Sequence, residues 1–200
     1  HAVMNYPLSD SIKDYFLRGV KKPHQFIDEI NSQSMYYRQQ ISEVMFNLLD
    51  SHDTERILAT AKGDVQLVKS ALACLFLQRR TPCFYYGTEL ELDGGPDPDC
   101  RRVMPWNRVS DSNEMLNFMK KLIQLRKDVS DIIQHGNYSL KEIKPDVVSL
   151  AWDYDGQKIQ AIFNQSSENY LVDRDSVALA SHCQERDNQL VILPKGFVIE

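Results

Sequence analysis

Apolar and polar positions along the first 130 residues alternate between short continuous apolar runs and amphipathic stretches. The apolar runs predict buried strands at residues 3–6, 45–50 and 82–87. Stretches with apolar residues at a spacing near 3.6 predict helices at residues 9–19, 24–44, 64–76 and 111–125. Because strands separated by helices form parallel sheets, this part of the chain is of the α/β class.

Polar residues and glycine predict where several of these helices begin and end. Ser9 and Asp64 stand at N-cap positions, Asp111 opens the last helix, and Gly19 ends the first. Residues 88–109 form a long loop between a strand and a helix. Loops of this length inside a compact domain are usually functional or disordered.

The period of the pattern changes to two after about residue 134. Apolar alternation at 147–154 and 158–163 flanks Asp155-Gly156, and Asp-Gly between alternating runs is a strong hairpin signal. Further strands are predicted at residues 170–172, 189–193 and 197–199. We therefore expect an α/β part at 1–133, followed by a small antiparallel all-β domain at 134–200.

Composition excludes several classes of function. A hydrophobic content of 42% with a net charge of −5 is typical of a soluble globular chain, and no basic stripe indicates nucleic-acid binding. No apolar run is long enough to span a membrane, and no signal peptide is visible. The four cysteines form no CxxC pair, which favours reduced thiols and a cytoplasmic location.

Four segments, in this order, resemble blocks of the α-amylase family of glycoside hydrolases. They are Val-Met-Asn-Tyr-Pro at 3–7, Leu-Leu-Asp-Ser-His-Asp-Thr-Glu-Arg at 48–56, Thr-Pro-Cys-Phe-Tyr-Tyr-Gly-Thr-Glu at 81–89, and Gly-Gly-Pro-Asp-Pro-Asp-Cys-Arg-Arg at 94–102. Their wording is similar to the neopullulanase, cyclomaltodextrinase and maltogenic amylase branch. Four residues depart from the wording usual in the family: Asp50, Thr88, Glu91 and Pro96.

The resemblance implies a fold for each part of the chain. Residues 1–133 would be the C-terminal portion, strands 6 to 8, of a catalytic (β/α)8 TIM barrel, and residues 134–200 a small antiparallel β-sandwich. A portion of a barrel has open strand edges with apolar faces. We therefore expect these edges to be covered by an oligomeric partner or by the remainder of a longer chain.

The resemblance also implies a chemistry. The family cleaves α-glucosidic bonds of starch, pullulan and cyclodextrins by a retaining mechanism that uses a nucleophilic Asp and an acid Glu. Asp53 matches the third carboxylate, which stabilises the transition state, and His52 matches its sugar-binding neighbour. Asp97 and Arg101 match residues that bind sugar hydroxyls, and Tyr86 and Tyr6 are further candidates at strand ends.

The family's Gly-x-Arg-x-Asp block, which carries the nucleophile, does not occur in these 200 residues, and the acid Glu of the family belongs to a strand upstream of strand 6. We therefore expect the chain to carry one of three catalytic carboxylates and to be inactive alone. No cofactor is expected; calcium sites occur in relatives, but no dense acidic loop typical of a calcium site is present.

Three other functions stay open at this point. The chain could belong to a transglycosylase or isomerase that acts on the same α-glucans, or to a non-catalytic carbohydrate-binding or scaffolding protein. A metal-dependent hydrolase using His52, Asp53 and His1 is disfavoured because the sequence lacks a second clustered ligand pair.

Structural interpretations compete with the functional ones at several positions. Asp53 could simply cap a helix at 54–58, and Asp97 could pair with Arg101 only to hold its loop. Four more residues have a structural default: Glu55 and Arg56 as a solvated helix start, Tyr85 as a core residue, and Trp106 as a packing anchor.

Overall fold

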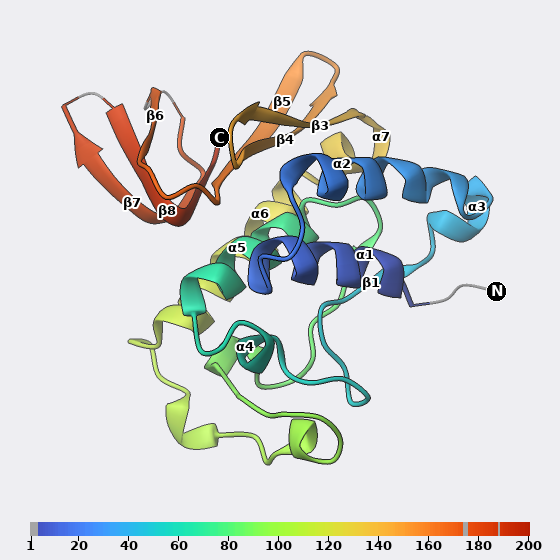
Figure 1. Cartoon of the computed structure of the whole chain (residues 1–200), viewed down its shortest axis with the longest axis vertical. Helices are drawn as coiled ribbons and strands as arrows, with labels where there is room; N and C mark the ends of the chain where they lie inside the picture. Colours follow the sequence, from blue (N-terminus) through green and yellow to red (C-terminus); the bar gives the residue numbers. More distant parts are fainter. Residues whose placement is uncertain (1–3, 174–175, 188) are drawn as a thin grey trace.

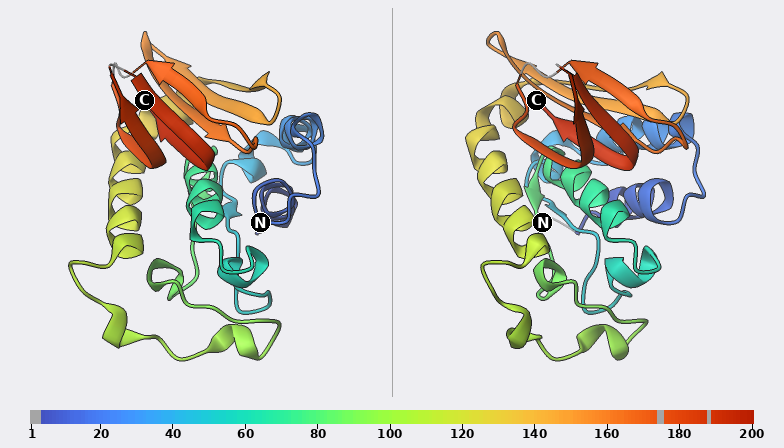
Figure 2. Two further views of the ribbon diagram at one scale, coloured as in Figure 1. Left: turned by 60° about the vertical axis from the view of Figure 1, so that its left-hand side comes forward. Right: turned by 90° about the vertical axis from the view of Figure 1, so that its left-hand side faces the viewer.

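The computed structural model describes residues 4–173, 176–187 and 189–200. Figure 1 shows a curled antiparallel sheet at one end, helices in the middle, and long irregular loops at the opposite end. The helices α5 (Val65–Phe76) and α6 (Glu114–Asp128) run between the sheet and the loops, as both views of Figure 2 show. The polar loops that follow the parallel strands therefore lie far from the antiparallel sheet.

The first helix begins earlier than the sequence pattern predicted. Helix α1 (Tyr6–Ile12) starts directly after Asn5, whose side chain accepts a hydrogen bond from the Leu8 amide. The predicted cap, Ser9, is instead a buried residue inside the helix. A π-helical segment, η1 (Lys13–Leu17), continues α1, and Gly19 follows it with a φ of 62°, which agrees with the predicted end.

The long helix predicted at 24–44 is divided into three pieces. These are α2 (Pro23–Ser32), the 3-10 turn η2 (Gln33–Met35) and α3 (Gln39–Ser42). The face of α2 that carries Phe26 and Ile30 is buried, so the helical spacing was interpreted correctly for that part. Met35 and Tyr36, by contrast, are exposed, and the apolar stripe that would extend α2 is not continuous.

Parallel pairing joins the three predicted strands of the first part, although the paired stretches are short. Strand β1 (Phe46–Asn47) pairs in parallel with β2 (Thr81–Pro82), and Met4 forms a parallel bridge to Phe46. The predicted strand at 3–6 is thus represented by Met4, and residues 1–3 lie outside the described residues. Beyond Pro82 the chain loses regular pairing, so the strand predicted at 82–87 is mostly a loop.

Two further helices follow the predicted pattern closely. Asp64 caps α5 by accepting hydrogen bonds from the amides of Gln66 (3.0 Å) and Leu67 (3.2 Å). Helix α6 begins later than expected, because Asn113, rather than Asp111, caps it through the Leu116 amide. The short helix α7 (Ser130–His135) leads into the sheet.

The C-terminal part is a six-stranded antiparallel sheet in the order β3-β4-β5-β8-β6, with β7 also paired to β8. Its strands are β3 (Asn137–Lys144), β4 (Val147–Tyr154), β5 (Gln157–Asn164), β6 (Tyr170–Asp173), β7 (Leu179–Arg186) and β8 (Gln189–Ile199). The predicted Asp155-Gly156 hairpin joins β4 and β5. Strands β3 and β7 were not predicted, and the two C-terminal runs are one continuous strand.

A single buried cluster extends from the helices into the sheet. The Phe16 ring lies 5.2 Å from that of Phe163, and Phe163 lies 5.8 Å from Phe197. The Trp152 indole donates a 2.7 Å hydrogen bond to the Leu77 carbonyl at the end of α5. This cluster contains residues on both sides of the predicted domain boundary at residue 133. The boundary stays a prediction. In the part of the chain that the structure describes, no helix is long and apolar enough to cross a membrane.

Candidate functional site

The turn that follows β1 presents His52 and Asp53 to solvent. Ser51 and Thr54 hold this turn: the Ser51 amide donates to the Thr54 hydroxyl (2.9 Å), and the Asp53 amide donates to the Ser51 hydroxyl (3.2 Å). The His52 Nε2 lies 3.3 Å from Asp53 Oδ1, and the two side chains are 64% and 61% exposed. The turn therefore offers a carboxylate and an imidazole side by side on an open surface.

Asp53 does not cap the helix that follows it. Helix α4 (Ile57–Thr60) begins after Arg56, and the Ile57 amide donates to Asp50 Oδ2 (3.3 Å). Thr88 donates its hydroxyl to the same oxygen (3.3 Å). The capping role that competed with a functional one thus belongs to Asp50, which leaves the Asp53 carboxylate available for a ligand.

Asp50 is an almost fully buried carboxyl that sequence reasoning did not select as part of the site. Burial raises its pKa above the ordinary value, against the lowering effects of the Ile57 amide, the Arg56 charge and the Thr88 hydroxyl. Its Oδ1 has no hydrogen-bond partner among the described residues. A short acidic residue directly after the buried Leu48-Leu49 pair was the available signal for it.

Two ion pairs stabilise the loop that carries the other predicted sugar-binding residues, Asp97 and Arg101. Arg101 Nη2 lies 2.9 Å from Asp97 Oδ1, and Arg102 binds Asp99 through two nitrogens at 2.8 and 2.7 Å. Arg102 and then the Gly95 amide, which donates to the same carboxylate, lower the pKa of Asp99. The loop also needs glycine at 94, where a Cβ would lie 2.6 Å from the Asp99 carbonyl oxygen.

Two side chains of the loop donate hydrogen bonds to the main-chain carbonyl of His52 in the turn. Arg101 Nε donates to the His52 carbonyl (3.0 Å), and the Cys100 thiol donates to the same oxygen (3.2 Å). These contacts link His52 and Asp53 on the turn with Asp97 and Arg101 on the loop. The Asp97–Arg101 pair that competed with a sugar-binding role is present, and an exposed pair of this kind can still bind a ligand.

Arg56 is buried, so its interpretation as a solvated residue was wrong. Its side chain is 0% exposed and donates to the carbonyl oxygens of Cys100 (2.7 Å) and Tyr86 (2.6 Å). The guanidinium also lies over the rings of Tyr85 and Tyr86, at 4.1 and 4.6 Å from their centroids. Glu55 accepts a hydrogen bond from Thr60 and remains partly exposed.

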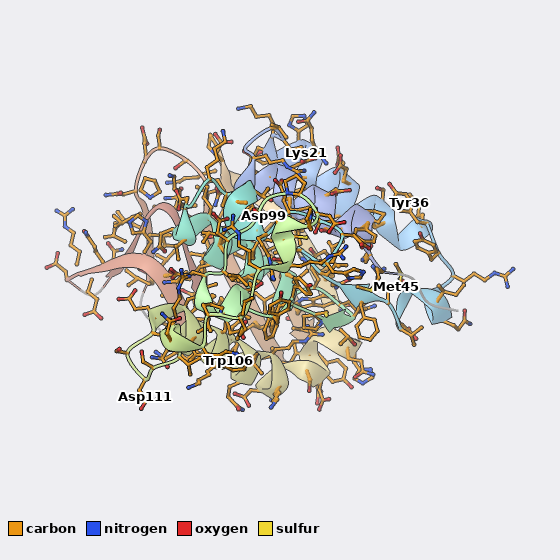
Figure 3. All side chains as sticks on the ribbon, turned by 90° about the horizontal axis from the view of Figure 1, so that it is seen from below. Lys21, Tyr36, Met45, Asp99, Trp106 and Asp111 are labelled. Carbon is orange, nitrogen blue, oxygen red and sulfur yellow. The ribbon has the colours of Figure 1, made fainter. Side chains whose placement is uncertain are left out.

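The aromatic candidates lie in different settings. The Tyr86 hydroxyl donates to the Arg102 carbonyl (2.6 Å), so this half-exposed ring borders the loop. Tyr6 is also half-exposed, and within the described residues no side-chain hydrogen bond links it to the turn or the loop. Trp106 is 72% exposed, so the packing interpretation was wrong. Figure 3 shows Asp99 near the middle of the loop face and Trp106 nearer its edge.

The turn and loop form an open surface rather than an enclosed cavity. A cavity of about 510 Å³ lies at the other end of β1 and β2, where Ser42, Arg80 and Tyr138 belong to its lining. None of the predicted site residues lines it. Over residues 4–173, 176–187 and 189–200, no group of three His, Cys, Asp or Glu side chains is placed to hold a metal ion. The metal-hydrolase alternative therefore gains no support, and His1 lies outside the described residues.

Comparison with known proteins identifies the family of the chain. The alpha amylase catalytic-domain family matches residues 1–128, a span that contains the turn, the loop and all six predicted site residues. The chain belongs to the α-amylase family. This is a family of glycoside hydrolases. Cleavage of a glycosidic bond is therefore the reaction for which the site has to be tested.

The relatives are named after the branch that the sequence blocks resembled. The chain is 38% identical over 169 residues to the intracellular maltogenic amylase of Bacillus subtilis, covering 84% of this chain and 29% of that protein. It is 43% identical over 126 residues to a cyclomaltodextrinase of a Bacillus species, covering 63% of this chain and 23% of the relative. It spans less than a third of the length of each.

The fold of the chain is also similar to that of a solved structure from this branch. A solved cyclomaltodextrinase structure superposes with a TM-score of 0.79 at 29% identity, covering 99% of this chain and 36% of that one. The superposition includes the curled antiparallel sheet as well as the helices and the loops. An α-amylase-type fold is therefore established for the chain as a whole.

Proposed function

We propose that the protein containing these 200 residues cleaves α-1,4 glucosidic bonds in α-glucan oligosaccharides by a retaining mechanism, with α-1,6 bonds as a second candidate linkage. The observation that carries this proposal is the solvent-facing His52–Asp53 turn, held beside Asp97 and Arg101 in a member of the α-amylase family. Substrates of this class are pullulan, cyclodextrins and maltooligosaccharides, in keeping with the names of the relatives.

Asp53 is assigned the stabilisation of the transition state. In a retaining glycosidase the reacting sugar acquires oxocarbenium character, and an ionised carboxylate nearby opposes that charge. His52 donates a hydrogen bond to a hydroxyl of the same sugar. Its position 3.3 Å from Asp53 allows both side chains to reach one sugar ring. Together they bind and polarise the substrate rather than attack it.

Asp97 and Arg101 are assigned to sugar hydroxyls on the non-reducing side of the cleaved bond. A carboxylate accepts from hydroxyl groups and a guanidinium donates to them, and the 2.9 Å pair presents both at one place. Tyr86 borders the same loop, and Tyr6 stands at the end of the adjacent parallel segment; both are assigned weaker contacts to the sugar chain.

The nucleophile and the general acid are assigned to residues beyond these 200. We therefore infer that the isolated chain binds glucan weakly and does not cleave it. No cofactor is part of the proposal. The four free cysteines and the name of the intracellular relative support a cytoplasmic location.

The same proposal covers the architecture. The three parallel segments are assigned to strands 6 to 8 of a TIM barrel at 1–133, and residues 134–200 to the β-sandwich that follows it. Met4 (37%) and Phe46 (48%) are exposed on the paired segments, which supports a face that other parts of the protein cover. Light scattering that shows a compact monomer of the isolated 200 residues would count against this assignment.

Reducing-sugar release tests the function directly. The full-length protein should release reducing ends from γ-cyclodextrin or maltohexaose with retention of anomeric configuration, whereas residues 1–200 alone should give only background. Product analysis on the same samples separates hydrolysis from transfer, because a transglycosylase makes longer or cyclic products. Binding without turnover by the full-length protein would instead favour the carbohydrate-binding alternative.

A further inference from the structure

Arg56 forms hydrogen bonds with segments that are distant in the sequence but adjacent at the candidate site. Its backbone amide donates to the Gly94 carbonyl (2.9 Å), its Nε to Cys100 and its Nη1 to Tyr86. Gly94 and Cys100 lie on either side of Asp97 in the loop, and Tyr86 ends the segment that follows β2. Arg56 thus fixes residues 94–100 at both ends to the chain that follows β1.

The bonds form a closed circuit through the candidate site. From Arg56 the path passes through Cys100 to the His52 carbonyl, which Arg101 also binds, and back along the turn to Arg56. Arg101 in turn bonds Asp97. A shift of the Arg56 guanidinium would therefore move the His52 carbonyl and the Asp97–Arg101 pair together.

The chemistry of this position specifically requires a guanidinium. In the part of the chain that the structure describes, the Arg56 side chain donates to carbonyl oxygens and lies over two tyrosine rings. No carboxylate forms an ion pair or hydrogen bond with it there, although its charge lowers the pKa of the buried Asp50. A planar group with donors in several directions can satisfy two carbonyls while its face stacks on aromatic rings. A lysine ammonium can neither stack in this way nor reach both carbonyls with fixed geometry.

We propose that Arg56 is a positioning residue of the glycosidase site, which holds the His52–Asp53 turn and the Asp97–Arg101 loop in their productive relationship. It does not contact the sugar. This inference rests on the proposed function, because the turn and the loop are assigned to substrate there. A displacement of either by a fraction of an ångström lowers the rate, because orientation contributes strongly to catalysis.

The chain contains a matched control in Arg126. This mostly buried arginine also donates to main-chain carbonyls, those of Phe76 (2.9 Å), Gln78 (2.8 Å) and Arg80 (2.7 Å), but at the opposite end of β2. Burial lowers its pKa to about 10. Arg126→Lys therefore removes a similar set of bonds from a partly buried guanidinium without touching the candidate site.

The test compares Arg56→Lys with Arg126→Lys in the full-length protein, below the melting temperature of both variants. We expect both to lower the melting temperature. Only Arg56→Lys should lower kcat/KM for maltohexaose by about 10- to 100-fold, while Arg126→Lys stays within about threefold of wild type. Hydrogen–deuterium exchange should rise at residues 50–54 and 94–102 in Arg56→Lys alone.

Coupling to Asp97 separates positioning from a general structural role. In an Asp97→Ala background, Arg56→Lys should cost less in kcat/KM than it does in the wild-type background, because one of the two groups that Arg56 positions is already missing while the His52–Asp53 turn remains. An unchanged cost in both backgrounds, or equal losses in the two Arg→Lys variants, would overturn the inference. A wild-type protein without glycosidase activity would overturn the proposed function instead, and the exchange comparison would still test the positioning of the loop.

Discussion

Arg101 Nε donates a 3.0 Å hydrogen bond to the main-chain carbonyl of His52, across 49 positions of sequence. The same guanidinium lies 2.9 Å from the Asp97 carboxylate. One side chain therefore connects the turn that carries Asp53 with the loop that carries Asp97. Because the turn and the loop come from different strand–loop units, their relative placement depends on bonds of this kind.

Replacing Arg101 by leucine should weaken substrate binding. The variant loses the bond to the His52 carbonyl and leaves Asp97 without its cation, so we expect the KM for maltohexaose to rise by about tenfold, as for the loss of a charge-assisted hydrogen bond. Arg102→Leu is the matched control: among the described residues its side chain pairs with Asp99 of the same loop, and the bond that its carbonyl accepts from the Tyr86 hydroxyl does not depend on the side chain. Equal KM values for the two variants would contradict the assignment of Arg101.

The buried Asp50 carboxyl should make stability depend on pH. Because burial raises its pKa in the folded chain, the unfolded chain ionises first as pH rises above the ordinary value of 3.8, and stability is lost. Asp50→Asn removes this titration while it keeps an acceptor for Ile57 and Thr88. The free energy of unfolding of the variant, relative to wild type, should therefore increase from about pH 4 to about pH 7 in urea titrations. A difference that is constant over this range would refute the expectation.

Asp64 should contribute to stability in the opposite pH direction. Burial raises its pKa, but the hydrogen bonds from Lys195, Leu67 and Gln66 outweigh burial and leave it lowered. The stabilisation is therefore present above the unfolded pKa and lost as pH falls through the folded one. Asp64→Ala should cost about 1 kcal/mol at neutral pH through loss of the cap of α5. The exposed Asp111, which caps no helix, serves as the control, and a penalty for Asp64→Ala that does not shrink in acid would contradict the assignment.

Trp152 should be a main anchor between the sheet and the helices. Its buried ring lies 4.7 Å from that of Tyr138, and its indole nitrogen bonds Leu77 at the end of α5. Trp152→Ala should cost about 3–5 kcal/mol in thermal or urea unfolding, while Tyr154→Ala, which changes an exposed ring on the same strand, should cost less than about 1 kcal/mol. Similar penalties for the two variants would show that the interface does not depend on this ring.

The features that the sequence predicted well depend on neighbouring residues. Asp64 caps a helix through amides two and three positions away, and Asp155-Gly156 turns a hairpin between adjacent strands. Strand β7 was missed because half of its residues are exposed and only one is buried, so its alternation of apolar and polar residues is weak. The parallel pairing of β1 with β2 followed from the order of the elements, but the length of the pairing did not.

Tertiary contacts decide the features that the sequence did not predict. Arg56 is buried only because the segments that end at Tyr86 and Cys100 close over it, and no pattern near residue 56 indicates this. Two departures from the family wording, Asp50 and Thr88, bond each other across 38 positions. A third, Glu91, adopts a left-handed φ of 56° where the family commonly has glycine. In each case the partner lies far away in the sequence or the backbone conformation is set by the loop.

Asp53 carries the central claim, and its replacement in the full-length protein is the most direct test. Asp53→Asn keeps the shape of the turn but removes the charge assigned to the transition state, and the exposed Asp111→Asn removes an equal charge elsewhere. With folding checked by circular dichroism, kcat for maltohexaose should fall by at least about 10²-fold in Asp53→Asn and stay near wild type in Asp111→Asn. A full rate of reducing-sugar release from Asp53→Asn would contradict the account.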